Sequence, residues 1–307
     1  MPFATTLVKV LLMLVYALPG YIFVKFKIIR IDCTKDLSKI LMYICQPCLE
    51  LYSFNKVIEY SGELLPSLGL FFVITLVAQV AAVFLLKLVF KGKQNESAYR
   101  VATVAGVFGN FGFFGTPLLE TLLPQYPQAV VYAAVLAVSM NAVAWTVGLY
   151  VMTGDRTYMR PIKALLCPNV AALVIVLPLF ITGTALPQFI ADPVDLMGKI
   201  SLPLCMFVCG MRLAASDLKK IFTSKSVYIT MLIKLVLLPL AVLGIMHLLP
   251  ISYELRTTVF ILCCCPTAAL VQSLAEIFDG DRAAAAADVL AADVLCGITI
   301  PLLCMLA

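Results

Sequence analysis

The chain alternates between long apolar runs and short connections that carry most of its charge. A helix needs about 20 residues to cross the ~30 Å hydrocarbon core of a bilayer, at ~1.5 Å per residue. Measured against that length, ten runs predict membrane-spanning helices: 5–26, 37–55, 64–90, 101–123, 129–153, 164–183, 194–213, 226–249, 257–278 and 283–306. The pattern therefore predicts an all-α integral membrane protein with ten spans.

Composition narrows the class of protein further. Of the 307 residues, 63% are apolar and 13% are charged, whereas soluble domains average about 25% charged residues. A single histidine, His247, excludes a histidine-rich metal site or an HExxH helix, so we expect no metal and no cofactor. The net charge of +5 is modest, so we expect the lipid bilayer as a partner and not nucleic acid.

The basic residues indicate how the spans are oriented. They cluster in alternate connections, namely Lys25, Lys27, Arg30 and Lys35, then Lys91, Lys93 and Arg100, then Arg156, Arg160 and Lys163, then Arg212, Lys219, Lys220 and Lys225. Cytoplasmic loops are enriched in Lys and Arg. The connections after spans 1, 3, 5 and 7 are therefore predicted to be cytoplasmic, and both termini to lie outside.

Prolines suggest that the second half of the chain repeats the first. Pro47 and Pro203 are 156 residues apart, and Pro19 and Pro178 are 159 apart. The repeats would be 1–160 and 161–307, each with five spans. Because five is odd, the two halves would cross the membrane in opposite directions, an arrangement typical of transporters.

The fourth and ninth runs are interrupted near their centres. Residues 109–117 place three glycines and Pro117 within one span, and Cys265, Pro266 and Thr267 interrupt the other. Open backbone inside a membrane is tolerated where it is buried in protein or lines a watery cavity. We expect the helix after each break to carry its proline in the first turn and to direct free amides at an anion. The alternative is a pair of simple proline kinks.

Several polar residues are predicted to lie at mid-membrane depth. Asn110, Asn141, Lys234, Pro266 and Asp293 fall about 13–18 Å from the starts of their spans. Charged groups at that depth are costly and often functional. Asp293 is a candidate carrier of a proton and Lys234 a candidate partner for an anion. The alternative is that the two pair as a structural salt bridge.

Motifs along nearly the whole chain resemble the auxin efflux carrier family of membrane transporters, whose prokaryotic members include malonate or malate permeases. The stretches that carry the resemblance are Pro19-Gly20-Tyr21, Gln46-Pro47-Cys48, residues 109–120, Pro203-Leu204, Gly210-Met211-Arg212-Leu213, Lys234-Leu235, Pro239-Leu240 and residues 298–303. Asp288 and Asp293 depart from the usual pattern of the tenth span. The short connection 154–163 lacks the long loop of the plant carriers, so we expect a bacterial protein of the cytoplasmic (inner) membrane.

The resemblance implies two inverted five-helix repeats. Spans 1, 2, 6 and 7 would form a scaffold, and spans 3–5 and 8–10 a transport domain in which helices 4 and 9 cross at the substrate. The candidate substrate-binding residues are Asn110, Gly112, Gly115, Thr116, Pro117, Asn141, Cys265, Pro266 and Thr267, with Lys234 and Asp293 as candidates for charge or ion coupling.

These observations favour a secondary active transporter of a small organic anion, a mono- or dicarboxylate, working by an elevator or rocking motion. The coupling ion, H⁺ or Na⁺, is left open, and a homodimer is possible. A channel or membrane sensor that uses the same broken helices is the alternative. We do not expect an enzyme, because Asp288 and Asp293 share one helix on different faces and so do not form an aspartyl protease pair.

Overall fold

The computed structural model describes residues 3–155, 157, 168–216, 224–278 and 280–306. Within these residues the chain is helical, and no strand is present beyond one isolated β-bridge. The helices of the first half are α1 (Phe3–Val15), α2 (Ala17–Lys25), α3 (Cys33–Ile40), α4 (Gln46–Asn55), α5 (Ser61–Val89), α6 (Ser97–Ala105), α7 (Thr116–Leu122), α8 (Ala129–Val143) and α9 (Leu149–Thr153). Those of the second half are α11 (Pro168–Thr182), α12 (Gln188–Ala215), α14 (Lys225–Leu232), α15 (Leu238–His247), α16 (Tyr253–Cys263), α17 (Ala269–Ile277) and α18 (Arg282–Leu303).

Six continuous helical stretches in the described residues are long and apolar enough to cross a membrane: Phe3–Lys25, Ile58–Val89, Ala129–Thr153, Gln188–Ala215, Lys225–His247 and Arg282–Leu306. The other four predicted runs are of different kinds. Residues 37–55 are helical but less apolar, 101–123 and 257–278 are broken, and 164–183 begins outside the described residues. Five basic residues of the predicted cytoplasmic connections also lie outside the described residues, namely Arg156, Arg160, Lys163, Lys219 and Lys220.

Wide π-helical turns precede three of the prolines. The segments η1 (Leu41–Cys45), η3 (Phe111–Gly115) and η6 (Ile233–Leu237) each end two residues before Pro47, Pro117 or Pro239. Proline has no amide hydrogen, and its ring clashes with the carbonyl four residues earlier. A π-turn relieves that clash while the helix continues. The fourth π segment, η4 (Ala144–Gly148), has no such proline.

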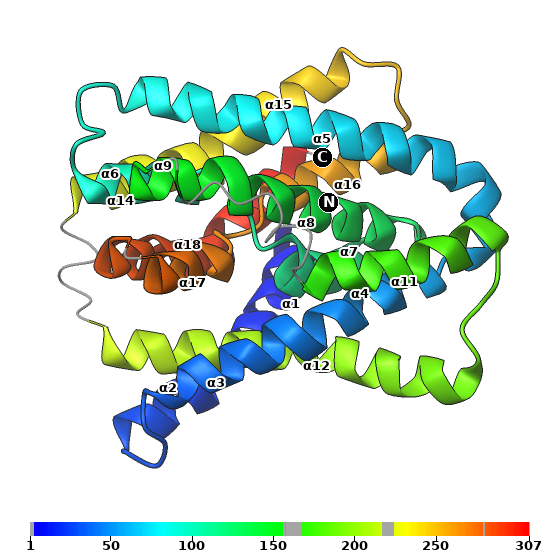
Figure 1. Ribbon diagram of the computed structural model, residues 1–307, viewed down its shortest axis with the longest axis horizontal. Coiled ribbons are helices and arrows are strands. Elements are labelled where there is room, and N and C mark those ends of the chain that lie inside the picture. Colours follow the sequence, from blue (N-terminus) through cyan, green and yellow to red (C-terminus); the bar gives the residue numbers. More distant parts are fainter. Residues whose placement is uncertain (1–2, 156, 158–167, 217–223, 279, 307) are drawn as a thin grey trace.

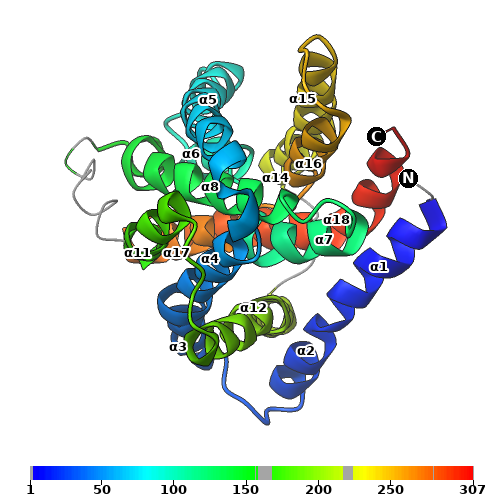
Figure 2. The same ribbon diagram turned by 90° about the vertical axis from the view of Figure 1, so that its right-hand side faces the viewer.

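The helices form two groups. In the first group α12 packs against α2 and α4, and α11 packs against α4. In the second group α5 packs against α8, while α18 contacts α6, α14 and α17. Figure 1 shows α5 and α12 on opposite sides of the bundle with α8 and α18 between them, and Figure 2 shows the same order from the end. Helix α1 lies at the edge and contacts α18.

Long helix α5 shows how the bundle meets lipid. Its buried positions follow one face, where Leu64, Leu68 and Phe71 are at most 9% exposed. On the other face Leu70 and Val77 are 63% and 61% exposed. An apolar face of this extent is unfavourable in water and suits a lipid environment.

Hydrogen bonds near the ends of the helices define two ends of the bundle. At one end Ser97 donates to Asp281 at 2.9 Å and Arg100 donates to the Met152 carbonyl at 3.1 Å. At the other end the Leu186 amide donates to Asn55 at 2.8 Å. We call the first the basic end, because Lys91, Lys93 and Arg100 lie there, and the second the opposite end.

Candidate functional site

The two broken runs meet through their backbones at the centre of the bundle. The Asn110 amide donates to the Pro266 carbonyl at 2.8 Å, and the Ala268 amide donates to the Phe108 carbonyl at 3.0 Å. Gly109 and Thr267 thereby form an antiparallel bridge. These bonds satisfy backbone groups that open chain in a membrane would otherwise leave unpaired. We call residues 106–110 and 264–268 the crossover.

Neither break places its proline in the first turn of the helix that follows it. After the first break the helical segment begins at Phe111 with the π-turn η3, and α7 continues it from Thr116, so Pro117 lies six residues after the start. Helix α17 begins at Ala269, three residues after Pro266. The prediction that Pro266 starts its helix is therefore wrong, because the Pro266 carbonyl is engaged by Asn110 and Thr267 is held in the bridge.

A cavity of about 90 Å³ borders the crossover and extends toward the basic end. Both helix groups contribute to it. Its polar lining consists of Ser38, Gln46, Asn110, Asn141, Arg212, Ser273 and Asp293, and apolar side chains such as Met42, Phe113 and Trp145 complete the wall. The first turn of α17 also lines it through Ala269 and Leu270, so the positive end of that helix dipole faces the cavity.

Arg212 and Asp293 are the two charged residues of the cavity wall. Arg212 is 8% exposed and donates to Ser38 at 3.2 Å. Asp293 is 6% exposed, accepts from the Cys209 thiol at 3.0 Å, and has a second oxygen, Oδ1, with no hydrogen-bond partner among the described residues. Cys209 precedes Arg212 by three residues on α12, so these two side chains lie on the same face of that helix. The cavity thus holds one cation that can bind an anion and one carboxylate that can hold a proton.

The amides that line the cavity retain capacity for a ligand. Asn110 donates through Nδ2 to the Cys205 sulfur at 3.7 Å, a long contact. Asn141 donates to the Ala137 carbonyl at 2.8 Å. Because amides have both donors and an acceptor, each side chain has groups left to orient a polar ligand.

Gly112 and Gly115 serve close packing in the segment that follows the crossover. A Cβ on Gly112 would lie 2.7 Å from the Gln46 amide nitrogen, so this glycine lets a side chain of α4 rest against the broken run. A Cβ on Gly115 would lie 2.8 Å from the Leu262 side chain. Gly112 lines the cavity, whereas Gly115 packs against α16.

The other predicted residues lie outside the cavity wall. Thr116 and Thr267 are buried, and Thr267 donates to the Ala105 carbonyl at 3.1 Å. Pro117 belongs to α7, and Cys265 lies in the crossover, where its thiol donates to the Ile261 carbonyl at 3.6 Å. No ion pair joins Lys234 to Asp293 in the described part of the chain: the Lys234 amine contacts the Val107 carbonyl, while Asp293 contacts Cys209.

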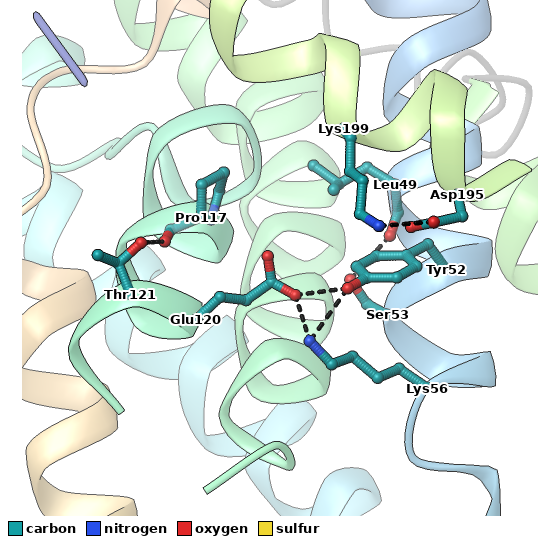
Figure 3. Close-up of polar contacts among 9 residues, drawn as sticks. All are labelled: Leu49, Tyr52, Ser53, Lys56, Pro117, Glu120, Thr121, Asp195 and Lys199. Atoms are coloured by element: carbon teal, nitrogen blue, oxygen red, sulfur yellow. Dashed lines mark hydrogen bonds and ion pairs between the residues drawn. The ribbon is translucent and has the colours of Figure 1, made fainter. Parts of the chain in front are cut away.

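A polar cluster closes the bundle on the other side of the crossover. Tyr52 donates to Glu120 at 2.6 Å, and the Lys56 amine contacts the same carboxylate oxygen. Beside them Lys199 donates to Asp195 at 2.6 Å and lies over the Tyr52 ring at 5.8 Å (Figure 3). We call these five residues the opposite-end cluster. Glu120 belongs to α7, whereas Tyr52 belongs to α4 of the first group and Lys56 caps the carboxyl end of α4. The cluster therefore joins the two groups where the cavity does not reach.

Comparison with known proteins shows the family of the chain. The family model described as membrane transport protein matches residues 2–161 and again residues 156–304. The chain belongs to this family of membrane transport proteins. It is the auxin efflux carrier family that the sequence motifs resembled, and the protein is therefore a multi-pass membrane protein of a transporter family.

Individual relatives are more distant. The chain is 28% identical over 162 residues to the uncharacterized transporter YfdV of Escherichia coli K12, and the same holds for YfdV of Shigella flexneri. The match covers 50% of this chain and 50% of each relative, so the chain spans about half the length of the curated relatives it matches.

Sequence reasoning missed Arg212 as a site residue. Arg212 was counted among the basic residues of a connection, because its position at the end of an apolar run is typical of a positive-inside signal. Its burial and its contact with Ser38 distinguish it from those exposed residues. The sequence signal that could have pointed to Arg212 is Cys209, about one helical turn earlier. Only the packing of α12 against α18 shows that Cys209 and Arg212 lie beside Asp293.

Proposed function

We propose that this protein is a secondary active transporter of a small organic anion, a mono- or dicarboxylate, in the bacterial cytoplasmic membrane. The observation that carries the proposal is a cavity at the crossover that contains buried Arg212 and the amino end of α17. Both groups favour a carboxylate, Arg212 by bidentate hydrogen bonding and the helix end by its free amides. Asn110 and Asn141 would orient the ligand.

The asymmetry of the bundle supports alternating access. The cavity extends toward the basic end, while the opposite-end cluster joins α4 to α7 on the other side. If the basic end is cytoplasmic, as the positive-inside rule indicates, this conformation is the one that faces inward. Transport would then require the second helix group, with α5–α9 and α14–α18, to move against α2–α4, α11 and α12 as inverted repeats allow.

Asp293 supplies a route for coupling to protons. Its carboxylate lies in the wall that Arg212 shares, so protonation of Asp293 would strengthen the field that an incoming anion meets. We therefore propose H⁺ as the coupling ion in preference to Na⁺.

The first test is ligand-dependent thermal stability of the purified protein with a panel of mono- and dicarboxylates. A ligand present at about 100 times its dissociation constant should add roughly 2.7 kcal/mol to the free energy of unfolding. Arg212→Gln should lose that response. Arg256→Gln is the matched control, because Arg256 stacks on Tyr253 on α16, outside the cavity wall.

The second test measures movement. Protein in liposomes should take up the stabilising carboxylate when a proton gradient is imposed, and uptake should stop when the gradient is collapsed. Absence of uptake for every carboxylate that stabilises the protein would refute transport and leave only binding. Currents far above carrier turnover would instead indicate a channel.

A further inference from the structure

Lys234 is a buried cation that the proposed site does not use. Its side chain is 0% exposed, and it lies in the π segment η6 behind the crossover. The amine donates to the Val107 carbonyl at 3.5 Å and lies 5.5 Å from the centre of the Phe111 ring. A Cβ on Gly109 would be 2.9 Å from the amine, so the amine reaches the crossover backbone itself.

The region around this amine is where two helices end. Helix α6 ends at Ala105 and α16 ends at Cys263. The carboxyl end of a helix carries partial negative charge. Val107 follows α6 by two residues, and Gly109, which the amine reaches, is bridged to Thr267, four residues after the end of α16. The amine therefore lies at the backbone where the segments that leave the carboxyl ends of α6 and α16 meet.

The partners of Lys234 are dipoles and not carboxylates. Within the described ranges no carboxylate lies within 4.0 Å of the amine. What remains are a backbone carbonyl, helix ends and the face of an aromatic ring, which attracts cations. A free metal ion placed between two helix carboxyl ends would meet the same set of groups.

We propose that Lys234 is a tethered cation that holds the crossover together in place of a free metal ion. It is a positioning residue: it neutralises the carboxyl ends of α6 and α16 and so keeps Gly109 and Thr267 paired. This inference shares one premise with the proposed function, namely that the crossover borders the substrate site. It predicts that the crossover forms without sodium.

The test restores the missing charge chemically. Lys234→Ala removes the amine and leaves space for a small one, and the melting temperature of this variant should fall. Ethylammonium chloride should recover at least half of the lost stability, whereas tetramethylammonium chloride at equal ionic strength should not, because it is too wide for the vacated space. Leu235→Ala is the control, since Leu235 is also buried, at 1% exposed, but carries no charge. Neither salt should restore it.

Two results would overturn the proposal. One is a Lys234→Met variant that melts together with wild type, which would show that the charge contributes nothing. The other is equal recovery of Lys234→Ala and Leu235→Ala by ethylammonium.

A measurement on wild-type protein covers the case in which the variants do not fold. Replacing all sodium by choline should leave the melting temperature unchanged, and a sodium-specific rise would count against a tethered cation. None of these measurements needs substrate. Failure of liposome uptake beside successful recovery by ethylammonium would therefore refute the proposed function and leave this inference in place.

Discussion

The contact between α2 and α12 makes a quantitative prediction. Gly20 and Gly210 meet where these helices cross: a Cβ on Gly210 would lie 1.8 Å from the Ala17 carbonyl oxygen, and one on Gly20 would lie 2.0 Å from that of Phe207. Both obstacles are backbone atoms, so no side-chain rotation relieves the clash. Gly210→Ala must therefore push the helices apart.

The size of the effect follows from that distance. Real Cβ contacts do not fall below 3.0 Å, so the gap must open from 1.8 Å by about 1.2 Å. A gap of 0.5–1 Å already forfeits roughly a quarter to a half of each dispersion contact. Overpacking typically costs about 1–3 kcal/mol, and we expect the upper end because the backbone cannot yield. For a chain of this size about 3 kcal/mol corresponds to a melting temperature lower by roughly 5 °C.

The assay is thermal unfolding of the purified protein followed by intrinsic fluorescence or by exposure of buried cysteines. Gly69→Ala is the matched control, because Gly69 lies within α5 and a Cβ there meets nothing within 4 Å. Alanine also has the higher helix propensity, so this control should melt at or slightly above wild type. Equal melting of Gly210→Ala and Gly69→Ala would refute the close crossing of α2 and α12.

Three further predictions concern function. Glu120→Gln should speed carboxylate counterflow by no more than about fivefold, because a half-exposed ion pair is worth at most ~1 kcal/mol; slower counterflow would contradict the role of the cluster as a closure. Asp293→Asn should abolish stimulation by an imposed proton gradient while carboxylate-dependent stabilisation persists, and continued stimulation would place the coupling proton elsewhere. Gly112→Ala should weaken carboxylate binding without loss of fold, because the Gln46 side chain can move aside into the cavity. Titrating the thermal shift with the carboxylate measures this affinity, and an unchanged affinity would contradict the assignment of Gly112 to the binding site.

Sequence patterns located the breaks but not their contacts. Glycines and prolines interrupt helices for local reasons, which is why the break before Pro117 was predictable. That Asn110 bonds to the Pro266 carbonyl joins residues 156 positions apart, and no local rule supplies such a pairing. The proline positions also explain three π-turns, although the turns themselves were not predicted.

Counting along the spans predicted one common depth for the polar residues but could not predict the direction in which each side chain points. The structure places Asn110, Asn141, Lys234 and Asp293 at the crossover or in the wall of the cavity beside it. Asn110, Asn141 and Asp293 line the cavity, while Lys234 lies behind the crossover. Position along a helix follows from the number of residues, but the side that faces a neighbour depends on how the helices are rotated when they pack.

The sequence alone therefore determined the class of protein, the six continuous apolar spans of the described residues and the two broken runs, because hydrophobic length and backbone chemistry are local properties. The tertiary structure decided which groups share a cavity. Arg212 becomes a candidate site residue only because α12 packs beside α18, and Gly20 has no room for a side chain only because α12 passes so close to it. Packing of this kind depends on the shapes of two distant surfaces at once, and neither surface is specified by its own stretch of sequence.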